Sequence, residues 1–91
     1  MIGSMERPLL SIQREPDTDS ILWWVKCQVG QVGGFSMVFT DMEQADAVIR
    51  HVTSVHATSL DPASLRHVAV LRQLALDEAA AWQNDKRLGY L

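Results

Sequence analysis

The stretch that decides the fold is ILWWVKCQV, residues 21–29. It is rich in β-branched and aromatic residues, which pack well on the pleated surface of a β-sheet. Successive side chains of a strand point to opposite faces, so the stretch has one largely apolar face and one mixed face. The first face carries Ile21, Trp23, Val25, Cys27 and Val29, and the second carries Leu22, Trp24, Lys26 and Gln28.

The segments on either side of this stretch predict two further strands. The side chains of residues 9–14 alternate loosely between the two faces of a strand, and this segment ends at a turn that contains Pro16. In residues 35–40, the side chains of Phe35, Met37 and Phe39 share the face directed to the core. Gly30, Gly33 and Gly34 lie between the second and third strands, and we expect them to supply the positive φ angles of a hairpin connection. The pattern predicts a three-stranded antiparallel meander.

Two helices are predicted after the strands. The segment TDME, residues 40–43, matches a capping box, in which Thr40 begins a helix that we expect to end near Ala57. The pair Asp61-Pro62 predicts a second helix, with Asp as its N-cap and Pro at its first position, and Gly89 is the first residue suited to end it. The sequence therefore predicts an α+β fold in the order βββαα, built in two layers.

The composition is that of one ordinary globular domain. The 91 residues are 47% hydrophobic and 21% charged, with a formal net charge of −3. We place the domain at residues 8–91 and interpret residues 1–7 as a flexible N-terminus or a remnant of cloning. A single cysteine, Cys27, excludes an internal disulfide, and neither a signal-peptide pattern nor a membrane-length apolar run is present. We expect a cytoplasmic protein that does not contact a membrane.

Residues able to carry chemistry are few. His51 and His56 diverge on a helix, and although His67 can approach His56 across the next turn, two imidazoles are too few for a structural zinc site. Cys27 lies on the apolar strand face, where burial makes a thiol inert. An enzyme would need a composite site across a dimer, for instance His56 with His67 and Asp61. We therefore expect no catalytic residues, no metal and no cofactor.

Two apolar surfaces are left over once the core is assigned. Trp24 faces away from the helices in this fold, and we predict a partner-binding patch there, formed by Leu22, Trp24, Lys26 and Val38. The alternative is that the arm Arg7–Leu9 folds over Trp24. The second helix is apolar on two sides, which favours a homodimer through this helix, with self-association residues Val70, Leu74 and Ala81.

These surfaces, together with the lack of a recognisable catalytic, metal or cofactor site in the sequence, favour a small non-catalytic protein-binding regulator or inhibitor. Its partner would be a larger bacterial or phage protein, with anti-defence and immunity proteins among the types that fit. The alternative is a nucleic-acid-binding module that uses the open sheet face, with Trp24 stacking on a base and Arg14, Lys26 and residues 86–87 contacting phosphates. Positive charge is sparse in this chain, so nucleic acid is the less favoured partner.

Overall fold

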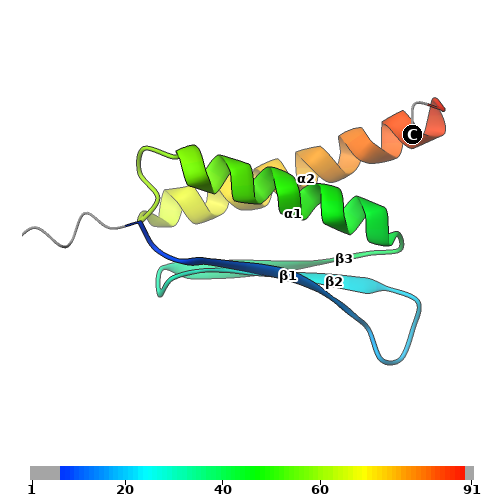
Figure 1. The fold of residues 1–91 in the computed structure, drawn as a ribbon, viewed down its shortest axis with the longest axis horizontal. Helices are drawn as coiled ribbons and strands as arrows, with labels where there is room; N and C mark the ends of the chain where they lie inside the picture. Colours follow the sequence, from blue (N-terminus) through cyan, green and yellow to red (C-terminus); the bar gives the residue numbers. More distant parts are fainter. Residues whose placement is uncertain (1–6, 90–91) are drawn as a thin grey trace, which may run out of the picture.

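The computed structural model describes residues 7–89 and shows an open antiparallel sheet with two helices on one of its faces (Figure 1). The predicted βββαα fold of the α+β class is confirmed. The part of the N-terminal assignment that concerns residues 1–6 lies outside the described residues. The elements are β1 (Leu10–Pro16), β2 (Trp23–Val29), β3 (Gly33–Phe39), α1 (Met42–Thr58) and α2 (Leu65–Arg87).

The core lies between the sheet and the helices, and β2 is the central strand of the order β1-β2-β3. The predicted alternation of β2 is confirmed, because Val25, Cys27 and Val29 are buried while Lys26 and Gln28 are exposed. The two helices bury a further set of side chains against them: Ala45, Val48, Val52, Leu71 and Ala75. Burial of these apolar groups is the main contribution to stability in a chain of this size.

The β2–β3 connection differs from the prediction in which glycines it uses. Gly30 alone has a positive φ, +50°, and the turn closes with a hydrogen bond from the Val32 N–H to the Val29 carbonyl. Gly33 and Gly34 belong to β3 instead. Gly34 is required for a different reason, since a Cβ atom there would overlap the Cys27 carbonyl oxygen of the neighbouring strand.

Both helices begin later than predicted. The N-cap of α1 is Asp41, whose carboxylate accepts a hydrogen bond from the Glu43 N–H at 2.9 Å, so Thr40 is not the cap. The N-cap of α2 is Ser64, whose hydroxyl accepts from the His67 N–H at 3.0 Å, so Asp61 and Pro62 lie in the preceding turn. In each case the side chain of the N-cap residue accepts from a free amide of the first turn.

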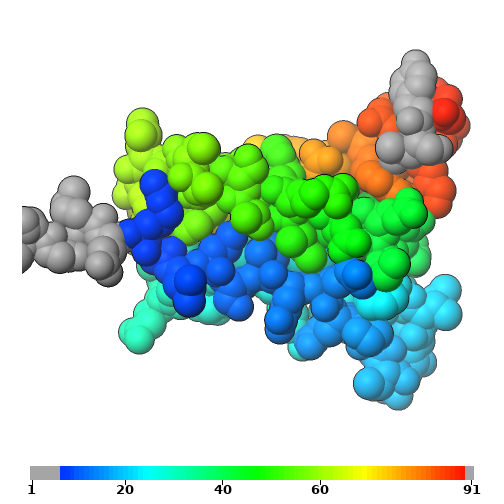
Figure 2. Space-filling view, in the orientation of Figure 1, coloured from blue at the N-terminus to red at the C-terminus, as the bar shows by residue number. Residues whose placement is uncertain are grey.

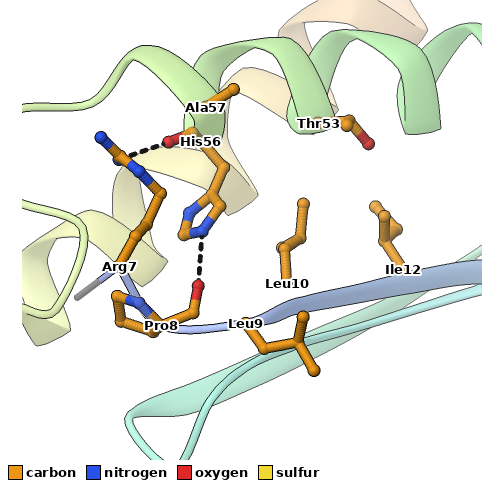
Figure 3. A pocket seen from close by; sticks show the side chains of 8 residues that line it. All are labelled: Arg7, Pro8, Leu9, Leu10, Ile12, Thr53, His56 and Ala57. Atoms are coloured by element: carbon orange, nitrogen blue, oxygen red, sulfur yellow. Dashed lines mark hydrogen bonds between the residues drawn. The ribbon is translucent and has the colours of Figure 1, made fainter.

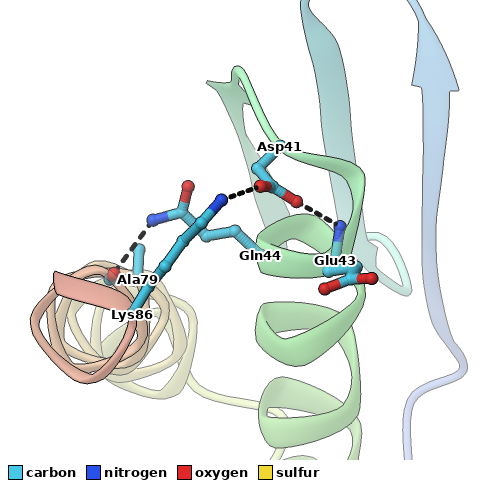
Figure 4. A network of polar contacts seen from close by, with 5 residues as sticks. All are labelled: Asp41, Glu43, Gln44, Ala79 and Lys86. Carbon is cyan, nitrogen blue, oxygen red and sulfur yellow. Dashed lines mark hydrogen bonds and ion pairs between the residues drawn. The ribbon is translucent and has the colours of Figure 1, made fainter. Parts of the chain in front are cut away.

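The end of α2 is fastened to the start of α1 (Figure 4). Lys86 donates to the Asp41 carboxylate at 2.8 Å, and the Gln44 amide donates to the Ala79 carbonyl at 2.9 Å. The Lys86 ammonium also holds the pKa of Asp41 below its usual value. Gly89 follows α2 with a φ of +85°, as expected for a residue that ends a helix. None of the helices within residues 7–89 combines the length and apolar character needed to cross a membrane.

Candidate binding surface and histidine cluster

One face of the sheet points away from the helices (Figure 1). By the alternation of β2 and β3, this face carries three of the predicted partner-binding residues: Trp24, Lys26 and Val38. Trp24 in β2 and Val38 in β3 are direct partners across the two strands. Val38 is 42% exposed and Trp24 is partly buried, so neither is enclosed by the chain. Leu22 lies just before β2, where its carbonyl accepts a hydrogen bond from the Asp17 N–H. The face therefore presents an apolar pair near the β1–β2 turn.

The N-terminal arm, defined as residues 7–9, does not cover Trp24. Pro8 lies against Gly30, at the far end of β2 from Trp24. Arg7 donates to the carbonyl oxygens of His56 and Ser59, at 2.7 and 2.9 Å. The arm thus packs against the C-terminal end of α1, and the alternative in which it folds over Trp24 is wrong.

Charges near Trp24 are largely neutralised within the chain. Lys26 forms an ion pair with Glu15 of the neighbouring strand. Arg14 points to the helix side of the sheet, where its Nε donates to the Asp46 carboxylate at 2.6 Å and its guanidinium lies 5.1 Å from the centre of the Trp23 ring. The cations proposed for phosphate contacts therefore do not converge on the open face.

The outer side of α2 holds the predicted self-association residues. Val70 is 43% exposed, Leu74 is partly buried and Ala81 is exposed. On the side of α2 that faces the core, Leu71, Ala75 and Trp82 are buried, whereas Leu65 at the start of the helix is 73% exposed. The role of Val70, Leu74 and Ala81 in a homodimer stays a prediction.

A cluster of two buried histidines joins the N-terminal arm to both helices. His56 and His67 are each 5% exposed, and His56 Nδ1 lies 2.8 Å from His67 Nε2, which confirms that His67 approaches His56 across the turn. His56 Nε2 lies 2.9 Å from the Pro8 carbonyl oxygen, and the Ser59 hydroxyl lies 3.2 Å from His67 Nδ1 (Figure 3 shows the His56 side of the cluster).

The contacts of the cluster define where its hydrogens lie when both rings are neutral. A carbonyl oxygen only accepts, so His56 donates to Pro8 through Nε2–H and its Nδ1 is an acceptor. His67 then donates to it through Nε2–H, which leaves His67 Nδ1 to accept from the Ser59 hydroxyl. Every ring nitrogen has one partner of the right kind. The neutral pair is therefore fully satisfied despite its burial.

The surroundings of His67 oppose a positive charge. Desolvation by burial lowers the pKa of His67 below its ordinary value, and the nearby His56 and Arg7 lower it further, while Asp61 acts in the opposite direction. His67, Ser59 and Asp61 also line a small cavity of about 150 Å³ with Ser64, Arg66 and Val70. His67 is thus suited to remain neutral in the folded chain near neutral pH.

Other candidates for chemistry are separated from this cluster. Burial raises the pKa of the Cys27 thiol to about 11, so the thiolate is scarce at neutral pH. His51 lies on another side of α1, 4.0 Å from the Glu78 carboxylate. No group of three or more potential metal ligands occurs within residues 7–89.

The sequence indicates that His67 can approach His56, but it does not indicate the other partners that define the chemistry of the two rings. Pro8 contributes only a carbonyl oxygen, which is common to all residues and gives no sequence signal. Ser59 follows the end of α1, where Ser is expected for backbone reasons alone. Comparison with protein-family models, with curated proteins and with solved structures finds no match to this chain.

Proposed function

We propose that this chain is a small non-catalytic regulator or inhibitor that binds a larger protein through its open sheet face. The observation that carries the proposal is the adjacent pair Trp24 and Val38 on the sheet face opposite to α1 and α2. Large aromatic side chains at the centre of an uncovered apolar patch commonly dominate binding energy at protein interfaces. Leu22 and Lys26 complete the proposed patch.

The charge pattern supports a protein partner over nucleic acid. Binding to nucleic acid depends on Lys and Arg side chains that neutralise phosphates. On this face Lys26 is already paired with Glu15, while Arg14 contacts Asp46 on the helix side and Lys86 contacts Asp41 in the helix layer. A neutral face with an apolar centre suits the core of a protein–protein interface, where charged residues are depleted.

The test is quantitative affinity purification from the native host with three tagged versions of the chain. These are the wild type, Trp24→Ala, and Leu9→Ala as the control, since Leu9 is 79% exposed and lies outside the patch. We expect a partner whose recovery falls at least about tenfold with Trp24→Ala, because a central Trp contributes roughly 2 kcal/mol or more to binding. Recovery with Leu9→Ala should equal that of the wild type.

The proposal is wrong if Trp24→Ala recovers every wild-type partner in full. Thermal unfolding of Trp24→Ala, followed by circular dichroism, must show that the variant is folded at the temperature of the purification. A partner that is a nucleic acid would appear instead as a salt-sensitive mobility shift with oligonucleotides, and that result would also contradict the proposal.

A further inference from the structure

The histidine cluster fastens together three segments that are distant in the sequence. The N-terminal arm supplies the Pro8 carbonyl and the Arg7 guanidinium, α1 supplies His56, and α2 supplies His67. Figure 2 shows the arm against the end of α1, and Figure 3 shows His56 reaching down to it. We propose that the His56–His67 pair is an acid-sensitive latch, which holds the arm on α1 when both rings are neutral and releases it when the pair takes up protons.

The geometry limits how many protons the closed latch can hold. One extra proton is compatible with the hydrogen bonds: His67 then donates from both nitrogens, through Nε2 to His56 and through Nδ1 to the Ser59 oxygen, from whose hydroxyl it no longer accepts. Two extra protons would place one N–H group against another across 2.8 Å. The second proton therefore requires the two rings to separate.

The first extra proton is also disfavoured, because it creates a buried charge in a positive environment. Arg7 of the arm faces the cluster directly, and Arg66 at the start of α2 lines the small cavity beside His67. Asp61 in the α1–α2 loop is the acidic group that acts on His67, and its attraction is outweighed, since the pKa of His67 is lowered overall. Apart from Arg7, the residues that line the groove with His56 are uncharged: Pro8, Leu9, Leu10, Ile12, Thr53 and Ala57.

Release of the arm would open a groove that already exists beside it. This groove, of about 490 Å³, lies between β1 and α1 and is bounded at one end by Arg7, Pro8 and His56 (Figure 3). Figure 3 shows the side chains of Leu10 and Ile12 extending from β1 towards α1. Movement of Pro8 would therefore expose the apolar side chain of Leu10 in this groove. A fall in pH would in this way change the surface that the chain presents to a partner.

The sign of the pH effect follows from proton linkage. The unfolded chain binds a proton at an ordinary histidine pKa of about 6.5, whereas the folded chain binds it only at lower pH. The stabilisation from the latch is therefore complete above the unfolded pKa and is lost as the pH falls through the lower, folded pKa of His67. Acid weakens the latch, and alkali leaves it closed.

Two backbone amides in one turn allow a direct test by hydrogen exchange measured with NMR. The Gly30 N–H donates to the Leu9 carbonyl of the arm, while the Val32 N–H donates to Val29 within the β2–β3 turn. Between about pH 7.5 and pH 5, we expect the protection factor of Gly30 to fall about tenfold or more, because a histidine released from the cluster has an ordinary pKa of about 6.5 and is protonated at the lower pH. The protection factor of Val32, corrected in the same way for intrinsic exchange, should change little.

Variants identify the titrating group. His67→Gln removes the ionisation, so the pH dependence of Gly30 protection should disappear. His51→Gln is the control, since His51 is a histidine of the same helix as His56 but lies outside the cluster, and it should keep the full dependence. Equal pH dependence at Gly30 and Val32 in the wild type would overturn the latch, as would an unchanged Gly30 response in folded His67→Gln. The wild-type comparison decides the question even if His67→Gln does not fold.

Discussion

Gly34 shows how one residue position is determined by its neighbour across the sheet. It pairs with Gln28 in β2, and a Cβ atom at Gly34 would overlap the Cys27 carbonyl oxygen and lie 3.2 Å from the Gln28 Cα. Both obstacles are backbone atoms, so the strand itself would have to move. The sequence shows three nearby glycines, but it does not show which of them forms the turn and which allows the two backbones to approach closely. The close approach depends on the register between β2 and β3, which the sequence does not define.

We predict that Gly34→Ala lowers the free energy of unfolding by about 2 kcal/mol, the usual cost of forcing atoms into a filled space. Gly33→Ala is the matched control, because the nearest atom to its new Cβ is a Val68 methyl carbon at 3.8 Å, an ordinary contact. Urea denaturation of the two variants and the wild type measures both changes. Equal stability of Gly34→Ala and Gly33→Ala would contradict the assigned register.

At the scale of single elements, local sequence patterns were sufficient for type and order but not for boundaries. The predicted start of α1 at Thr40 was one residue early, since Asp41 has the extended backbone of an N-cap, with φ −125° and ψ 123°. Thr and Asp are both good caps, and the choice between them depends on how the chain leaves β3. Positive φ angles strongly favour glycine, and Gly89 was correctly predicted to end α2. Of the three glycines predicted to supply positive φ angles in the hairpin, only Gly30 does so.

We predict that Asp41→Ala lowers the free energy of unfolding by about 1 kcal/mol, the typical loss on removing an N-cap side chain. Asp41→Asn should retain most of this stability, because the amide oxygen can still accept from the Glu43 N–H while the ion pair with Lys86 is lost. Thr40→Ala should have little effect. Chemical denaturation of the three variants measures these changes in the free energy of unfolding. A larger decrease for Thr40→Ala than for Asp41→Ala would show that Thr40 is the N-cap, as the sequence pattern predicted.

At the scale of the whole molecule, the outer side of α2 carries the prediction of a homodimer. We expect the purified chain to have twice its monomer mass of 10.2 kDa by light scattering at high concentration. Leu74→Glu should yield the monomer, since a charge would then lie among Val70 and Ala81 on the contact side. Leu76→Glu is the control, as Leu76 is 39% exposed but lies on another side of α2. A monomeric wild type throughout a concentration series would show that the dimer prediction is wrong.

The sequence alone determined the βββαα fold and the identity of the buried strand face, because the two-residue repeat of a strand and the 3.6-residue repeat of a helix are local properties. Only the tertiary structure decided the surroundings of His56. Its partners are His67, 11 residues away, and the carbonyl of Pro8, 48 residues away. Contacts over such separations arise from how the helices pack on the sheet, and a backbone carbonyl leaves no trace in the sequence. For the same reason, the neutralisation of Lys26 and Arg14 became visible only once strand register and helix position were known.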